Sequence, residues 1–299
     1  MVARRRPSRL VIWVLIALFT ISTISVATPA HALTYSQRVL AIRAAALMGY
    51  WALNETSGSL AMDLSGNGNN GTYQGTTLNG AIHPDGLSAP LFDGINDWVF
   101  IPNSTTLNPS GQLTISVWVN ATETTYWRGI VAKTDGATWN TGYGIFLPDT
   151  GEINAYLTGY SNGISANFSI LSSWVHLAYT NDGFTQRLYQ NGTLIAESGY
   201  VGGASTTDDL YIGVQPGGAG WYGSIARVAL WNEALDADEI SELADPSTTT
   251  IAPAANYTET LTLASGREVG LIYTFTVGEI TVGLLVFAVL IVLMFRGRR

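Results

Sequence analysis

The residues best suited to metal chemistry lie in a loop rich in glycine and asparagine, DLSGNGNNGTYQG, at positions 63–75. Calcium binds carboxylate, amide and carbonyl oxygens, so Asp63 and Asn67, with the carbonyl of Asn70, are candidate calcium ligands. The alternative is geometric. Glycines permit positive φ in a tight loop, and Asp63 and Asn67 can bond backbone groups as Asx turns. On either interpretation, the composition predicts neither strand nor helix here.

A second set of residues could bind a sugar. An aromatic ring covers the apolar face of a sugar while amides and carboxylates bind its hydroxyls. The candidates are aromatic residues that stand next to Gly, Thr and Asn, as in loops: Tyr126, Trp127, Trp139, Tyr143, Tyr160, Trp221 and Tyr222. GVQPGGAGWYGS, at 213–224, is the most suggestive stretch, because glycines surround two rings that we expect to be exposed. The alternative for each ring is ordinary loop packing.

Catalysis is not expected. The chain has no cysteine, and beyond residue 32 it has only two histidines, His83 and His176. No Ser/His/Asp order and no HExxH motif is present. FDGIND, at 92–97, carries two carboxylates, but it favours a turn in which Asp93 bonds its own loop backbone.

The ends of the chain predict export and anchoring. Arginines, an apolar run and Ala30-His31-Ala32 describe a secretory signal peptide at 1–32, with an uncleaved anchor helix as the alternative. Residues 269–295 end in the charge-free run ITVGLLVFAVLIVLMF and are expected to span the membrane, with Glu279 near the outer interface. The basic tail at 296–299 marks the cytoplasmic side. We therefore expect a single-pass type I membrane protein with an extracellular domain.

Charge narrows the range of partners. Residues 33–279 contain all 22 acidic residues and seven basic ones, a net charge of 7 − 22 = −15. Such a surface repels nucleic acid and other polyanions, so no nucleic-acid partner is expected. Without disulfides, an exported domain must be held by its own core.

The elements that would position these residues are mostly strands. From 48 to 231, strand-like runs alternate with Gly/Asn/Asp turns every 10 to 15 residues, as in a sandwich or barrel. Asn191-Gly192 predicts a hairpin turn with positive φ at both positions. In LTISVWVN, alternate residues from Leu113 to Val119 share one face and Trp118 lies on the other. Five tryptophans inside strand patterns are expected in the core: Trp51, Trp98, Trp118, Trp174 and Trp231.

Helices are expected at both ends of the domain. Residues 33–47 read as a short amphipathic helix. ALDADEISELA, at 234–244, reads as a closing helix in which Asp236 and Glu239 form a capping box and Leu235 packs on Ile240. A Thr/Pro-rich stalk is expected over 246–268.

Taken in order, these pieces resemble a laminin G-like domain of the concanavalin A-like lectin/glucanase superfamily. The resemblance runs from about Tyr35 to Ala244 and rests on this ordered set: YWALNETSG, DLSGNGNNGTYQG, LFDGINDWVFIP, LTISVWVN, WVHLAYT, RLYQNGTLIA, LYIG and GSIARVALWNEALDADEI. It implies an all-β fold over residues 48–245, a jelly-roll sandwich of two antiparallel sheets. It also implies a structural calcium near the first loop, completed by an acidic residue of the last strand, where this chain has Ala226.

The resemblance also bears on function. Glycosidases of the superfamily carry paired carboxylates on one strand as E-x-D-x-x-E, and this chain has no such run. We expect a surface-displayed binding module that recognises a glycan or a surface protein. The alternatives are a structural protein of a cell envelope or virion surface that acts by protein–protein contact, and a degenerate glycosidase. Seven N-x-S/T sequons are present, at Asn54, Asn70, Asn103, Asn120, Asn167, Asn191 and Asn256.

Overall fold

A computed structural model describes most of residues 34–247 and two later strands. The described residues are 34–123, 127–136, 141–148, 151–168, 171–200, 202, 206–247, 256–262 and 268–274. The expected signal peptide at 1–32, the basic tail at 296–299, and most of the expected membrane span therefore lie outside them. So do Tyr126 and Trp139.

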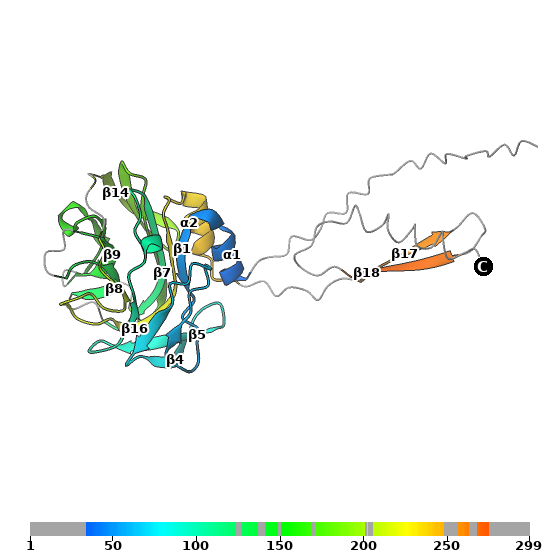
Figure 1. The fold of residues 1–299 in the computed structure, drawn as a ribbon, viewed down its shortest axis with the longest axis horizontal. Coiled ribbons are helices and arrows are strands. Elements are labelled where there is room, and N and C mark those ends of the chain that lie inside the picture. The colour runs from blue at the N-terminus through cyan, green and yellow to red at the C-terminus, as the bar shows by residue number, and fades with distance from the viewer. Residues whose placement is uncertain are drawn as a thin grey trace, which may run out of the picture. The chain divides into compact units, whose positions relative to one another are not determined.

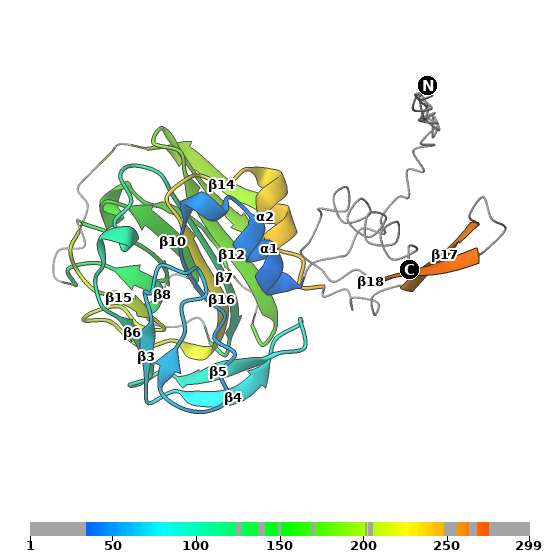
Figure 2. The same ribbon diagram turned by 45° about the vertical axis from the view of Figure 1, so that its right-hand side comes forward.

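Two antiparallel sheets form the body of the fold (Figures 1 and 2). Sheet A has the order β14 (Thr193–Gly199), β13 (Thr185–Gln190), β12 (Trp174–Asn181), β7 (Leu113–Ala121), β16 (Tyr222–Trp231), β5 (Ser88–Asp93) and β4 (Thr77–Ile82), with β1 (Leu47–Trp51) also paired to β16. Sheet B has the order β11 (Ile164–Asn167), β10 (Glu152–Leu157), β9 (Tyr143–Leu147), β8 (Arg128–Lys133), β15 (Leu210–Ile212), β6 (Trp98–Ile101), β3 (Gly71–Gln74) and β2 (Leu60–Ala61). The expected all-β, two-sheet jelly-roll architecture is confirmed.

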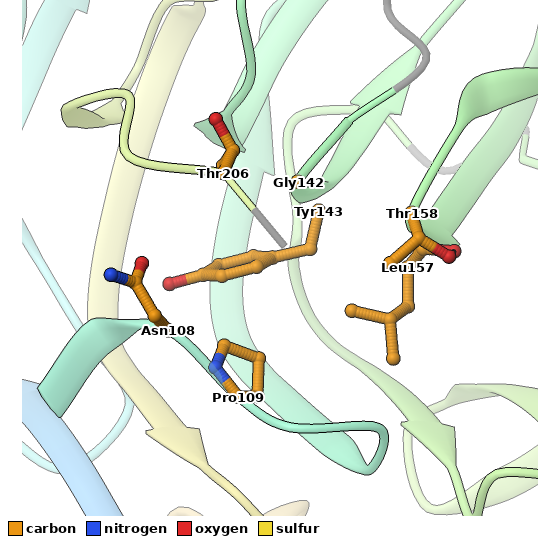
Figure 3. A pocket seen from close by; sticks show the side chains of 7 residues that line it. All are labelled: Asn108, Pro109, Gly142, Tyr143, Leu157, Thr158 and Thr206. Carbon is orange, nitrogen blue, oxygen red and sulfur yellow. The ribbon is translucent and has the colours of Figure 1, made fainter. Parts of the chain in front are cut away.

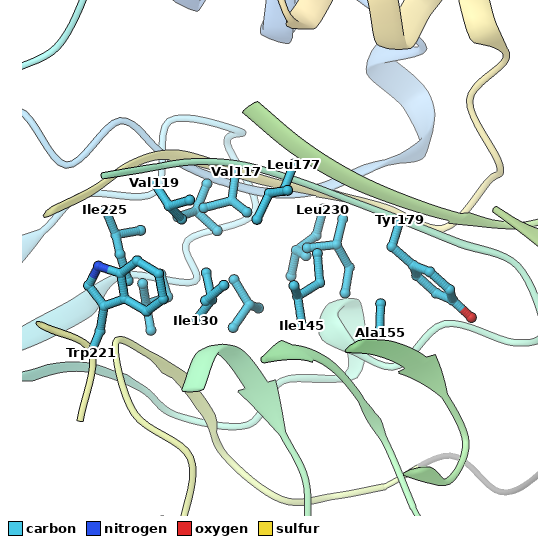
Figure 4. Packing of buried hydrophobic residues seen from close by; sticks show 14 of the residues in the cluster. Val117, Val119, Ile130, Ile145, Ala155, Leu177, Tyr179, Trp221, Ile225 and Leu230 are labelled. Carbon is cyan, nitrogen blue, oxygen red and sulfur yellow. The ribbon is translucent and has the colours of Figure 1, made fainter. Parts of the chain in front are cut away.

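The main core lies between the sheets (Figure 4). Val117, Val119 and Leu177 from sheet A face Ile130 and Ile145 from sheet B. The period-two prediction for β7 is confirmed, because its alternate residues from Leu113 to Val119 are all fully buried in this core. Trp118 joins a second buried cluster on the other face of sheet A, so β7 is buried on both sides.

Two helices cover that second face. They are α1 (Tyr35–Ala41) and α2 (Ala237–Leu243), and the indole of Trp118 donates to the hydroxyl of Tyr35 at 3.1 Å. The capping box of Asp236 and Glu239 is confirmed. The first helix is shorter than expected: it ends at Ala41, and a 3-10 turn, η1 (Ala44–Ala46), leads into β1.

Other local predictions have clear outcomes. Asn191 and Gly192 join β13 to β14 with φ of 50° and 78°, as the hairpin signal predicted. Leu235 and Ile240 are both buried in the helix-covered cluster. Of the five tryptophans assigned to the core, Trp98 and Trp174 are partly exposed, and the other three are buried.

Beyond α2, the described residues differ from the expected stalk and helix. β17 (Asn256–Thr262) pairs antiparallel with β18 (Glu268–Thr274). The sequences NYTETLT and EVGLIYT are rich in Thr, Tyr, Val and Ile, which favour strands. The two strands lie at positions expected in the stalk, 256–262, and at the start of the span, 269–274, and the stalk and the span as a whole stay predictions. No helix within the described residues is long and apolar enough to cross a membrane.

Candidate functional site

Four aromatic rings gather on the outer face of sheet B, and they are called here the outer-face cluster. Trp127 precedes β8, Phe146 lies in β9, Tyr156 lies in β10, and Tyr160 begins the 3-10 turn η3 (Tyr160–Asn162). The centroid separations are 5.3 Å for Trp127 and Tyr160, 5.1 Å for Phe146 and Tyr156, and 6.1 Å for Phe146 and Tyr160. Because their strand neighbours face the core, Phe146 and Tyr156 must point away from it.

The cluster has a buried base and a more exposed rim. Phe146 and Tyr156 have no exposed surface, whereas Trp127 and Tyr160 are partly exposed. Burial raises the pKa of Tyr156 to about 12. Gly159 has a φ of 121°, a value that glycine adopts easily. This turn lets Tyr160 fold back over the sheet and meet Trp127.

Polar groups accompany the rings. Asn154 precedes Tyr156 on β10 by two positions, so it lies on the same face. Its Nδ2 donates to the Ser165 hydroxyl at 2.8 Å. Rings that present a flat apolar surface beside amide and hydroxyl groups can bind a sugar through its CH face and its hydroxyls.

The structure thus brings two of the predicted ligand residues together, Trp127 and Tyr160. Phe146 and Tyr156, which belong to the same cluster, were not among the sequence candidates. They follow strand alternation in YGIFL and EINAYL, and this periodicity could have identified them as facing away from the core. It could not have shown that Tyr160 returns to meet them.

Tyr143 and Trp221 are not exposed rings, and the prediction of exposure is wrong for Trp221. Its side chain is fully buried in the core (Figure 4), with its indole donating to the Ser224 carbonyl at 3.2 Å. The glycine-rich loop folds back, as the Trp221 N–H donates to the Gly213 carbonyl at 2.6 Å. Tyr143 is also buried, and its hydroxyl donates to the Leu107 carbonyl at 3.1 Å.

A small cavity lies beside Tyr143 (Figure 3). Its volume is about 10 Å³, and its lining includes Asn108, Pro109 and Thr158. That volume has room for a single water molecule and not for a sugar.

Tyr222 lies on β16 of sheet A, and 38% of its surface is exposed. The Arg128 guanidinium lies 6.0 Å from the centre of its ring. Arg128 also donates to the Gly220 carbonyl and to Glu123. Tyr222 is thus a predicted sugar-binding ring that is exposed and contacts the Arg128 guanidinium.

The first loop uses its polar groups internally. The Asp63 carboxylate accepts the backbone N–H of Tyr50 at 3.0 Å, of Ser65 at 2.9 Å and of Asn69 at 2.8 Å. The Asn70 side-chain oxygen accepts the Asp63 N–H at 2.9 Å. The end of the stretch is strand β3, contrary to the prediction that no strand forms there.

These contacts match the geometric interpretation of the loop. The Asn67 amide donates to the carbonyls of Leu47 and Met48. Ala226 is buried in the helix-covered cluster and offers no ligand. Among the described residues, no three His, Cys, Asp or Glu side chains gather as a metal site. None of these contacts tests calcium binding, so the calcium site stays a prediction.

The FDGIND stretch is a turn, as expected. The Asp93 carboxylate accepts the N–H groups of Ile95 at 2.8 Å and Asn96 at 3.2 Å. Asp97 is buried and accepts the Asp93 N–H at 2.9 Å. Both carboxylates therefore hold their own loop.

Comparisons with known proteins agree with this architecture. A laminin G family model, described as the concanavalin A-like lectin/glucanases superfamily, matches residues 93–241. No curated protein sequence matches the chain. Similar solved structures include domain 4 of a GH43 extracellular arabinanase from Geobacillus stearothermophilus, in complex with arabinotriose. The TM-score is 0.51 at 19% sequence identity, and the match covers 67% of this chain and 98% of that one.

Two toxin domains are similar as well. One is a structure of botulinum neurotoxin type C, whose cell entry depends on interaction with two ganglioside molecules; the TM-score is 0.54 at 15% identity, covering 75% of this chain and 58% of that one. The other is the binding domain of Paraclostridial Mosquitocidal Protein 1, with a TM-score of 0.53 and 15% identity, covering 79% of this chain and 66% of that one. The chain thus spans less than two thirds of either toxin chain. At these identities the likeness concerns the fold. By this family match and the two-sheet fold, residues 93–241 are identified as laminin G-like sequence of the concanavalin A-like lectin/glucanases superfamily.

Proposed function

We propose that the chain is a surface-displayed, membrane-anchored module that binds a glycan on the outer face of sheet B. The observation that carries this proposal is the pairing of Trp127 and Tyr160, two partly exposed rings 5.3 Å apart on a buried aromatic base. The base fixes their positions, so little conformational entropy is lost when a sugar binds. The arabinanase domain in complex with arabinotriose and the ganglioside-dependent neurotoxin support a sugar as the ligand class.

The charge of the domain favours a neutral glycan. Residues 33–279 carry a net charge of 7 − 22 = −15, which repels sulfated and other polyanionic chains. The proposed role is binding without catalysis, because the chain lacks the paired carboxylate run of the related glycosidases.

The test is a screen of the full chain on a glycan array, followed by affinity measurements with a neutral glycan that binds. Tyr160→Ala should weaken binding up to about tenfold, since an aromatic contact contributes about 0.5–1.5 kcal/mol. Phe184→Ala is the matched control, because this ring is 82% exposed and lies in the β12–β13 turn of sheet A. Equal affinities of Tyr160→Ala and wild type would contradict the proposed site.

The anchoring part of the proposal has its own test. Deletion of residues 269–299 should release the chain from the membrane fraction into the medium. Retention of the truncated chain in the membrane fraction, when its N-terminal sequence shows that residues 1–32 have been removed, would contradict an anchor at that end.

One observation favours the alternative of protein–protein contact. Three apolar residues of the β4–β5 hairpin are exposed: Ile82 (62%), Leu87 (46%) and Leu91 (39%). An envelope or virion protein would bury such residues against a neighbour. Sedimentation of the wild type and of Ile82→Ser would distinguish the two roles, because self-association that the variant abolishes would favour the structural role.

A further inference from the structure

Lys133 is the only lysine in the chain, and every other basic residue is arginine. It ends β8, and its side chain is completely buried. The ammonium nitrogen Nζ lies 2.8 Å from the side-chain oxygen of Asn103. It also donates to the backbone carbonyls of Thr206, at 3.4 Å, and Asp208. The buried amine of Lys133 therefore contacts the carboxamide of Asn103.

The surroundings favour a reactive amine. Burial lowers the pKa of Lys133 to about 8, although Asp208 and Asp209 act against this shift. A substantial fraction of the amine is thus neutral slightly above neutral pH, and a neutral amine is a nucleophile. Arginine stays protonated and could not take this role.

Carboxyl groups lie beside both partners. Asp209 accepts the backbone N–H of Asn103 at 2.8 Å, and Asp208 is the stronger electrostatic neighbour of Lys133. The Thr206 hydroxyl donates to the Asp208 carboxylate and holds it in place. A carboxyl group at this position can move a proton between two nitrogens.

We propose that Lys133 and Asn103 join in an intramolecular isopeptide bond. The neutral ε-amine attacks the side-chain carbonyl carbon of Asn103, which forms a new C–N bond. The bond from that carbon to Nδ2 then breaks, and Nδ2 leaves as ammonia with the proton that the attacking amine gives up. Asp208 or Asp209 carries this proton. No oxidant, reductant or cofactor is needed, and the contact of Nζ with the amide oxygen already places the amine beside the carbonyl group.

The position of the link suits a chain without cysteine. It closes a loop of 133 − 103 = 30 residues. It connects the chain just after β6 to the end of β8, two strands that β15 separates in sheet B. A covalent link here would constrain the unfolded chain in the way that a disulfide does.

The test is chemical and uses the full chain. The protein is denatured and treated with an amine-reactive label, then digested and examined by mass spectrometry. In the wild type, we expect Lys133 to stay unlabelled. We also expect a branched peptide that joins the Asn103 and Lys133 segments and is lighter than their sum by one ammonia. Full labelling of Lys133 in the denatured wild type, with only linear peptides, would overturn the proposal.

Variants identify the chemistry. Asn103→Ala removes the electrophile, so the Lys133 amine should become fully reactive in the denatured chain. Asp208→Asn or Asp209→Asn removes the proton carrier but keeps Lys133 and Asn103, and the Lys133 amine should again become reactive in the denatured chain. Thr105→Ala is the matched control, because it removes the sequon at Asn103 but keeps the carboxamide, and the link should persist. The wild type alone decides whether the bond exists, and a loss of the link in an Asp208 or Asp209 variant counts only where that variant has the circular dichroism spectrum of the wild type.

Discussion

His176 should make the sandwich lose stability in mild acid. It lies on β12 with no exposed surface, and its Nε2 is 2.8 Å from the Ser116 hydroxyl. Its ring centroid is 5.4 Å from that of Trp118. Burial, with a smaller effect from His83, lowers the pKa of His176 to about 3. The folded protein therefore holds this ring neutral at pH values where a free imidazole takes up a proton.

The magnitude follows from proton linkage. The pKa of His176 is about 6.5 in the unfolded chain and about 3 in the folded one. Protons therefore bind the unfolded state first. The stability is complete above about pH 6.5 and is lost as the pH falls toward 3, at about 1.4 kcal/mol per pH unit. Between pH 7 and pH 5, the expected loss is roughly 2 kcal/mol.

Other charged groups face the same space. The pKa of His83 is also lowered by burial, although Asp85 opposes the shift. Burial alone would raise the pKa of Asp85, but hydrogen bonds from His83 and Arg227 hold it well below its usual range. Asp85 therefore stays charged between pH 7 and pH 5, whereas a histidine of the unfolded chain takes up a proton in this range.

The assay is urea unfolding at pH 7 and pH 5 for the wild type and His176→Gln. Glutamine keeps a hydrogen-bonding group for Ser116 but does not titrate. The wild type should lose roughly 2 kcal/mol more than the variant between the two pH values. His83→Gln is the control, and it should leave the contribution of His176 intact. An equal loss in wild type and His176→Gln would refute the reasoning, because it would mean that the folded state does not keep His176 neutral.

Two further substitutions test buried polar groups. Asp85→Asn should cost about 3–5 kcal/mol of unfolding free energy at neutral pH, because Arg227 donates two hydrogen bonds of 2.7 Å to this buried carboxylate; a loss under about 1 kcal/mol would contradict this. Asp63→Ala should cost about 3 kcal/mol or more in the presence of a chelator, since three backbone N–H groups lose their acceptor. If calcium raises the unfolding temperature of the wild type but not of Asp63→Ala, the loop binds the ion; otherwise its role is geometric.

The features that the sequence predicted correctly depend on local rules. The alternation in β7, the capping box of Asp236 and Glu239, and the positive φ of Asn191 each involve residues that are close in sequence. Steric limits and side-chain direction decide them before any tertiary contact forms.

The errors concern distant contacts. Glycines near Trp221 predicted a flexible, exposed loop, but the same glycines allow the chain to fold back and bury the indole in the core. Tyr160 meets Trp127 across 33 positions of sequence (160 − 127). Composition indicated that both rings could bind a ligand, yet only tertiary packing brings them together.

Three buried polar side chains explain how a chain without disulfides can hold long loops in a fixed place. Asp63 accepts backbone N–H groups from β1 and from its own loop. Arg227, on β16 with a φ of 55°, donates to the carbonyl of Ala52 and to Asp85. Lys133 joins the segments around Asn103 and Asp208. Each of these side chains forms hydrogen bonds with several protein groups in place of water. Its removal would therefore leave buried polar groups of two segments without a hydrogen-bond partner. A domain built in this way can keep its outer-face rings in one position without a disulfide, provided that these side chains keep their buried partners.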